Sequence, residues 1–241
     1  MCGIVGYVGS REAFPIIIKG LQRLEYRGYD SAGVALMDGT VYKKQGKVAE
    51  LLAFTQDKNT VSTIGIGHTR WATHGVPNDV NSHPHTSQSQ RIALIHNGII
   101  ENYDSIKAEL LTRGHSFESD TDTEVLTHLI EEVKQQEGVS LFEAVRLALG
   151  EVIGAYAIAV IEDGNPNEIV VAKKGSPLVI GVGENEFFLA SDATPIIEYT
   201  KNVVYLEEGE IARLTIGEAM ELRTIDNEAK TPYIQELEMN L

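Results

Sequence analysis

The first hundred residues alternate short apolar runs with Gly, Asn and Asp, a pattern typical of β-strands mixed with helices. Two predicted strands, 32–37 and 40–44, flank Asp38-Gly39, a dipeptide that favours a β-hairpin. A helix is predicted over 15–26, where apolar side chains recur at helical spacing, and a loop rich in His, Pro, Asn and Ser over 72–90. Three more strands are predicted at 4–8, 63–69 and 91–95.

Helices dominate the middle of the chain and strands dominate its last third. Helices are predicted over 102–113, from Thr121 and from Ser140. The last two begin with capping boxes, because a Glu follows each cap by three residues. Strand-rich ends around a helical middle predict an α+β layered domain with largely antiparallel sheets. Seven further strands are predicted, at 155–161, 168–173, 178–182, 186–190, 203–206, 210–215 and 219–225.

The charge balance narrows the choice of partners, since 35 acidic residues against 20 basic ones give a formal net charge of -15. Binding to phosphate backbones or anionic membranes needs clustered Lys and Arg, so we expect neither a nucleic acid nor a membrane partner. No apolar run reaches the length of about 18 residues that a membrane span requires. The single cysteine excludes an intramolecular disulfide, and the N-terminus lacks a signal-peptide pattern, so the sequence predicts a cytoplasmic protein.

Cys2 carries the strongest chemical signal. Initiator Met is commonly removed before a small residue, so we expect the mature chain to begin with Cys2. Its α-amine, with a pKa of about 7.7–8.0, then lies beside its thiol and can act as a general base for that nucleophile. The alternative is that Cys2 is a small buried hydrophobe at the start of a strand.

A second candidate segment, 68–75, leads from a predicted strand into a loop. Arg70 offers a planar fork of donors for a carboxylate, and Trp71, the only Trp of the chain, has the size to cover a small ligand. The alternative is a surface ion pair for Arg70 and a half-buried anchor for Trp71. The other candidates in this segment, which add hydrogen-bonding groups or permit a tight turn, are Thr73, His74 and Gly75.

Two further candidates follow downstream. The amide of Asn97 and the backbone N–H of Gly98 can together hold a developing oxyanion, although Asn-Gly is also common in turns. Asp122 stands at a predicted helix start, where an acid usually serves as a cap or a partner of the helix dipole. With Arg70 for a carboxylate and Asp122 for an ammonium, the two would instead form a clamp for a free amino acid.

Histidines are concentrated in one stretch, because five of the seven lie between His68 and His96. His83-Pro84-His85 has a spacing compatible with metal binding, but the other ligands of a zinc pattern are missing. We therefore expect a loop held by hydrogen bonds, and neither a metal ion nor another cofactor.

Taken together, five segments resemble the glutamine amidotransferase domain of the glucosamine-6-phosphate synthase family, over essentially the whole chain. The first segment is shared with other cysteine-first amidotransferases, whereas RGYDSAG together with HTRWATHG is specific to the glucosamine-6-phosphate synthase branch. The resemblance implies a four-layer αββα N-terminal-nucleophile sandwich of the class II amidotransferase type. The segments are MCGIVG at 1–6, RLEYRGYDSAG at 23–33, GHTRWATHG at 67–75, HNGIIEN at 96–102 and SDTDTEV at 119–125.

The resemblance also implies a role for each candidate residue. Cys2 is the nucleophile, with its own α-amine as the base, and Asn97 with the Gly98 N–H forms the oxyanion hole. The carboxylate of L-glutamine is assigned to Arg70 and Thr73, and its ammonium to Asp122 together with the Gly98 carbonyl. The loop that closes over glutamine contains Trp71, His74 and Gly75.

The family enzyme continues into two sugar-isomerase lobes that bind fructose 6-phosphate, and we expect its full-length form to be a homo-oligomer. Residues 1–241 are thus predicted to be one glutamine amidotransferase domain, of which about the last ten residues lead into that isomerase region. Alone, the domain is expected to hydrolyse glutamine without making the amino sugar. Two alternatives stay open: another N-terminal-nucleophile amidohydrolase or a different class II amidotransferase, and an amino-acid-binding module without turnover.

Overall fold

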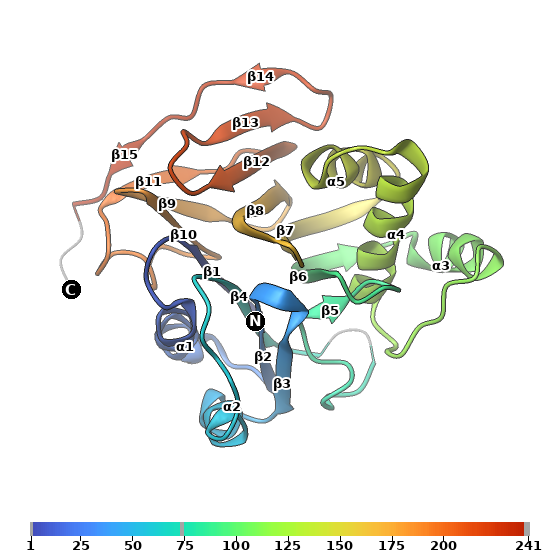
Figure 1. Cartoon of the computed structure of the whole chain (residues 1–241), viewed down its shortest axis with the longest axis horizontal. Coiled ribbons are helices and arrows are strands. Elements are labelled where there is room, and N and C mark those ends of the chain that lie inside the picture. The colour runs from blue at the N-terminus through green and yellow to red at the C-terminus, as the bar shows by residue number, and fades with distance from the viewer. Residues whose placement is uncertain (1, 73–74, 239–241) are drawn as a thin grey trace.

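The computed structural model describes residues 2–72 and 75–238. Its strands form two antiparallel sheets that face each other, and helices cover the outer face of each sheet (Figure 1). The layers therefore follow the order helix, sheet, sheet, helix. This arrangement confirms the predicted α+β class and the four-layer αββα sandwich.

The first sheet has eight strands, in the order β15-β11-β9-β10-β1-β4-β2-β3. Helices α1 (Ala13–Arg23) and α2 (Val48–Thr55) lie on its outer face. The strand bounds are β1 (Gly3–Val8), β2 (Ser31–Leu36), β3 (Val41–Gln45), β4 (Ile64–Arg70), β9 (Val179–Gly183), β10 (Glu186–Ala190), β11 (Asn202–Tyr205) and β15 (Gln235–Glu236).

The second sheet has seven strands, in the order β14-β13-β12-β8-β7-β6-β5. Helices α4 (Asp122–Glu137) and α5 (Leu141–Gly150) lie on its outer face, and α3 (Tyr103–Thr112) packs against α4 (Figure 1). The strand bounds are β5 (His85–Thr86), β6 (Ile92–Ile100), β7 (Gly154–Glu162), β8 (Asn165–Lys174), β12 (Glu210–Thr215), β13 (Glu221–Thr224) and β14 (Ala229–Lys230). None of the helices in the described residues has the length and apolar character needed to cross a bilayer.

Most predicted elements are confirmed, with differences at a few boundaries. The helix predicted over 15–26 is α1 followed by a single 3-10 turn, Glu25–Arg27, and another such turn, Met37–Gly39, joins β2 to β3. Helix α2 was not predicted, and β5 lies inside the segment that was predicted to be a loop. The strand predicted over 91–95 is five residues too short at its C-terminal end, because β6 continues to Ile100.

The strict alternation of side chains along each strand divides the core into an inner and two outer parts. On β1, Ile4 and Val8 belong to the apolar cluster between the sheets, whereas Val5 and Tyr7 belong to the cluster under α1. The inner row continues with Ile66 on β4 and Ile95 on β6. This alternation decides which residues near the strand ends face the space between the two sheets.

Candidate active site

Three candidate residues extend the inner rows of the sheets at one end of the sandwich. Cys2 precedes Ile4 by two positions, Arg70 follows Ile66 by four, and Asn97 follows Ile95 by two. A side chain that lies an even number of positions along a strand points to the same face, so all three are directed between the sheets. They line one cavity of about 480 Å³, together with Trp71, Gly98 and Asp122.

The Cys2 thiol is held by the backbone of Trp71. Sγ accepts the Trp71 N–H at 3.2 Å and lies 3.6 Å from the Trp71 carbonyl oxygen. Burial raises the pKa of the thiol, and the hydrogen bond from the Trp71 N–H only partly offsets this. A thiol that is mostly protonated near neutral pH needs a base in order to act as a nucleophile. Met1 lies outside the described residues, so its removal stays a prediction.

Asn97 and Gly98 lie within β6 rather than in a turn, so the turn alternative for this dipeptide is wrong. The Asn97 amide donates from Nδ2 to the carbonyl oxygen of Cys2 at 3.2 Å. Gly98 has φ +124°, and a Cβ at this position would lie 2.2 Å from the carbonyl oxygen of Ala155 on β7. The strand can therefore pass this point beside the thiol only with glycine.

Arg70 is buried, which contradicts the alternative of a surface ion pair. Its guanidinium donates to the carbonyl oxygens of Gly75 and Val76, both at 3.4 Å, and burial lowers its pKa. Gly75 has φ +80°, a left-handed conformation that favours glycine, but it is not one of the residues that line the cavity. Trp71 is 54% exposed and lines the cavity, which is compatible both with a cover over a ligand and with a half-buried anchor. Thr73 and His74 lie outside the described residues.

Asp122 is the first residue of α4 and is buried. Its Oδ2 accepts the backbone N–H of Ile100 at 2.8 Å, so the carboxylate is fixed against the end of β6. The cap of the helix is the preceding residue, Thr121, whose hydroxyl accepts the N–H of Glu124 at 3.3 Å. Asp122 therefore does not cap the helix, and it is one of the residues that line the cavity.

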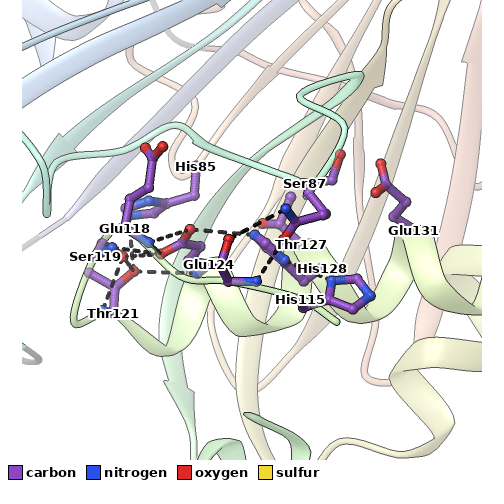
Figure 2. Close-up of polar contacts among 12 residues, drawn as sticks. His85, Ser87, His115, Glu118, Ser119, Thr121, Glu124, Thr127, His128 and Glu131 are labelled. Atoms are coloured by element: carbon purple, nitrogen blue, oxygen red, sulfur yellow. Dashed lines mark hydrogen bonds and ion pairs between the residues drawn. The ribbon is translucent and has the colours of Figure 1, made fainter. Parts of the chain in front are cut away.

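A polar cluster supports this helix start (Figure 2). Glu124 accepts the backbone N–H groups of Ser119 at 2.7 Å and Glu118 at 3.1 Å, and its Oε2 lies 3.4 Å from Nε2 of His128. Burial alone would raise the pKa of Glu124, but His128 and the hydrogen bonds outweigh it, so the pKa is lowered. His85 contacts the Thr121 hydroxyl at 3.0 Å. The cluster anchors the segment that presents Asp122 to the cavity.

The cluster extends along α4 through a pair of histidines (Figure 2). Nδ1 of His128 lies 2.9 Å from Nδ1 of His115, and Nε2 of His115 lies 2.8 Å from Oε2 of Glu132. These contacts join α4 to the segment that follows α3. The helix that carries Asp122 is therefore held at two successive turns.

The histidine loop is held by hydrogen bonds, as the sequence predicted. Nζ of Lys43 donates to the carbonyl oxygens of Val80 at 3.0 Å, Ser82 at 3.0 Å and Pro84 at 3.3 Å. His83 and His85 are both buried. Among residues 2–72 and 75–238, no three His, Cys, Asp or Glu side chains are grouped as metal ligands.

The cavity also contains residues that the sequence analysis did not single out. Arg27 lines it, and its guanidinium donates to the Ser191 hydroxyl at 2.9 Å and lies 3.6 Å from a carboxylate oxygen of Asp192. Arg27 lies in RLEYRGYDSAG, one of the segments on which the family resemblance rests. That position was the sequence signal that could have identified Arg27 as a site residue. The loop residues Ser176 and Pro177 reach the cavity from between β8 and β9 and have no comparable signal in the sequence.

The fold and the cavity together define a class. A cysteine at the head of the first strand of an αββα sandwich, with a carboxamide beside it, is the arrangement of N-terminal-nucleophile amidotransferases. A family model described as "Glutamine amidotransferase domain" matches residues 54–233, and the chain belongs to this family.

Two curated relatives show which branch of the family this chain resembles. It is 58% identical over 245 residues to the glutamine–fructose-6-phosphate aminotransferase (isomerizing) of Bacteroides thetaiotaomicron, an alignment that covers 100% of this chain and 40% of the relative. It is 46% identical over 244 residues to the enzyme of the same name from Pyrococcus horikoshii, covering 100% of this chain and 41% of the relative. The chain thus spans about two fifths of the length of these relatives.

Solved structures support the same fold. The glutamine phosphoribosylpyrophosphate amidotransferase of B. subtilis, in complex with ADP and GMP, aligns with a TM-score of 0.78 at 30% identity. The alignment covers 93% of this chain and 49% of that one. A structure described as the allosteric regulatory enzyme of purine biosynthesis aligns with a TM-score of 0.79 at 31% identity and the same coverage.

Proposed function

We propose that this chain hydrolyses L-glutamine to glutamate and ammonia through a thioester on Cys2. The observation that carries the proposal is the convergence of Cys2, Arg70, Asn97 and Asp122 on one cavity of about 480 Å³. A nucleophile, an oxyanion donor and two opposite charges are the groups that amide hydrolysis of a free amino acid requires. A binding module without turnover would need only the two charges.

The reaction starts when the α-amine of Cys2, exposed by loss of Met1, takes the thiol proton. The thiolate attacks the side-chain amide carbon of glutamine, and the negative charge that forms on the amide oxygen is stabilised by the Asn97 Nδ2–H and the Gly98 N–H. Collapse of this intermediate breaks the C–N bond, and the protonated α-amine returns its proton to the leaving ammonia. Water then attacks the thioester with the α-amine again as the base, which releases glutamate and restores the thiol.

The selection of free glutamine is assigned to two opposite charges that line the same cavity, since the carboxylate and the ammonium of an amino acid are attached to one carbon. Arg70 pairs with the α-carboxylate, helped by Thr73, and Asp122 pairs with the ammonium, helped by the Gly98 carbonyl. The segment that closes over the bound substrate contains Trp71, His74 and Gly75. The support for these roles is the burial of Arg70 and Asp122 beside the thiol, because a buried charge interacts more strongly with an opposite charge than an exposed one does.

For the whole protein, we propose that the ammonia is used to make glucosamine 6-phosphate from fructose 6-phosphate in the cytoplasm. The support is the name shared by the relatives and the fact that this chain spans 40% of the first of them, which leaves room for C-terminal isomerase domains. Residues 1–241 would then be one glutamine amidotransferase domain, with about the last ten residues leading into those domains. We propose a homo-oligomer for the full-length enzyme.

The test is ammonia release from L-glutamine by the purified chain, with intact mass measured on the same sample. We expect turnover by the wild type and none by Cys2→Ala. Binding of glutamine without turnover by the wild type would favour the amino-acid-binding module. Turnover of other amides in preference to free glutamine would favour a different N-terminal-nucleophile hydrolase.

A further inference from the structure

His68 lies next to the proposed oxyanion donor and has no role in the reaction described above. It is fully buried on β4, two residues after Ile66, and its side chain crosses the space between the sheets to reach β6. Its Nε2 lies 3.1 Å from the carbonyl oxygen of His96 and 2.9 Å from Oδ1 of Asn97. One ring nitrogen thus contacts two neighbouring residues of the opposite sheet.

The backbone contact fixes the protonation of this nitrogen. A carbonyl oxygen can only accept a hydrogen bond, so Nε2 of His68 must carry the proton that it shares with the His96 carbonyl. The same N–H then faces the Asn97 side chain, where an amide N–H would be repelled and the amide oxygen is attracted. The orientation of the Asn97 amide, which is often ambiguous by itself, therefore follows from a backbone atom.

We infer that His68 is a positioning residue, which holds Oδ1 of Asn97 so that the Nδ2–H group faces Cys2 and the oxyanion. This inference rests on the proposed glutamine hydrolysis. With Oδ1 bound to His68, Nδ2 lies 3.2 Å from the Cys2 carbonyl oxygen. If the amide rotated by half a turn, it would present an oxygen to a developing negative charge, and the donor would be lost.

The surroundings of His68 keep its ring neutral and fixed. The ring of His83 stacks on it with centroids 4.1 Å apart and planes inclined by 12°. Burial lowers the pKa of His68 to about 3, so the ring is neutral throughout the neutral range and carries one proton. Because the contact with the His96 carbonyl oxygen places that proton on Nε2, Nδ1 carries none. Nδ1 is buried and has no hydrogen-bond partner among the described residues. An N–H group at this position would be left without an acceptor, so an unprotonated nitrogen is favoured.

Strand β2 of the first sheet leaves room for His83 to approach this ring. A Cβ at Gly33, the β2 residue that pairs with His68, would lie 2.0 Å from the carbonyl oxygen of His83. Glycine at this position therefore permits the loop to approach the sheet. The stacking is a consequence of close backbone packing as well as of the hydrogen bonds from Lys43 to the same loop.

The first test is a double-mutant cycle on glutaminase activity. We expect His68→Leu to lower kcat at least tenfold with little change in KM, since the lost group acts on the transition state. His68→Gln, which keeps an N–H donor at a similar reach, should recover most of that loss. In the Asn97→Ala background, His68→Leu should have no further effect on kcat. Independent, multiplicative losses in the double mutant would overturn the inference.

Ile66→Ala is the matched control, because Ile66 lies on the same strand and face as His68, and its side chain belongs to the apolar cluster between the sheets. It should reduce stability while leaving kcat unchanged at temperatures well below unfolding. If Ile66→Ala lowers kcat as much as His68→Leu does, the effect is general to packing and His68 has no specific role.

The second test needs neither a variant nor activity. In the wild-type chain, nitrogen NMR of the histidine rings should show His68 protonated at Nε2 and not at Nδ1, with no titration between about pH 5 and 9. A proton on Nδ1 alone would overturn the inference even if the chain hydrolyses glutamine. The expected tautomer in a chain without glutaminase activity would instead leave the contact intact and count against the proposed function.

Discussion

The side-chain amide of Asn97 on one sheet donates to the carbonyl oxygen of Cys2 on the other, across 3.2 Å. The nucleophile and the proposed oxyanion donor are thus joined directly, although 95 positions separate them in the chain. Because each residue extends an inner row of its sheet, the geometry of the sandwich sets their separation.

Replacement of Asn97 tests the oxyanion role. Asn97→Ala removes a donor that acts chiefly in the transition state, so we expect kcat for glutamine to fall about 10²–10³-fold while KM changes little. Steady-state kinetics on the purified variant measure both constants. A raised KM with an unchanged kcat would identify Asn97 as a binding residue instead.

Gly98 tests the backbone requirement beside the thiol. Gly98→Ala should destabilise the fold by about 2 kcal/mol or more and abolish most activity, because the Cβ would meet the Ala155 carbonyl at 2.2 Å and φ is +124°. Gly150→Ala is the control, since a Cβ there has no atom within 4 Å and the site is helical. Urea unfolding measures the free energy of unfolding of both variants, and Gly98→Ala should be the less stable of the two. Equal stability of Gly98→Ala and the wild type would show that β6 moves without cost.

Much of this site was predictable from local sequence, because strand alternation and turn signals act over a few residues. The strands that begin after Cys2 and end near Arg70 follow from the apolar pattern, but both faces of β1 are buried, so this pattern does not show which row faces the other sheet. The extent of β6 was not predicted, since Gly98 interrupts a strand pattern and Asn-Gly favours turns. Its strand conformation depends on pairing with β7, which is a long-range contact.

Other parts of the structure were missed for different reasons. Helix α2 did carry a signal, because its buried residues Val48, Leu51 and Thr55 are spaced by three and four, but the segment is only eight residues long. The approach of Ser176 to the cavity depends on how the two sheets stack, and no local pattern encodes that. The positioning contact of His68 likewise becomes visible only when β4 and β6 face each other.

Glu124 is expected to make the free energy of unfolding depend on pH in the acid range. The pKa of Glu124 in the folded chain lies below the ordinary value of 4.5, so its ionised carboxylate stabilises the fold. This stabilisation is complete above about pH 5 and is lost as the pH falls through the pKa of the folded state. We expect Glu124→Gln to lower the free energy of unfolding by about 1–3 kcal/mol at pH 6, and by less at pH values near 3. Urea unfolding at both pH values measures the difference.

Glu137→Gln, at the exposed end of the same helix, is the control for Glu124. It should change the unfolding free energy by no more than about 0.5 kcal/mol at either pH. A Glu124→Gln effect that is the same near pH 3 as at pH 6 would mean that the charge of this carboxylate contributes nothing to stability.

The N-terminus tests the identity of the base. If the α-amine of Cys2 takes the thiol proton, a chain that retains Met1 should lose most of its glutaminase activity. The raised pKa of the thiol makes this dependence stronger, because little thiolate is present without a base. Intact mass and turnover measured on the same sample decide it. Full turnover by protein that retains Met1 would transfer the role to another group, such as His96 at the cavity wall.

Arg70 and Asp122 are expected to hold the carboxylate and the ammonium of free glutamine. Both side chains are buried at the cavity, so the loss of either leaves a substrate charge poorly compensated, at a cost of about 2–5 kcal/mol. Arg70→Ala and Asp122→Ala should each raise KM for glutamine strongly. An N-acylated glutamine lacks the ammonium, so Asp122→Ala should lower its kcat/KM much less than that of glutamine. Arg70→Ala should lower kcat/KM equally for both substrates. The values of kcat/KM for both substrates in the wild type and both variants complete a cycle. If the wild type turns over the acylated substrate as well as glutamine, the two charges do not select a free amino acid.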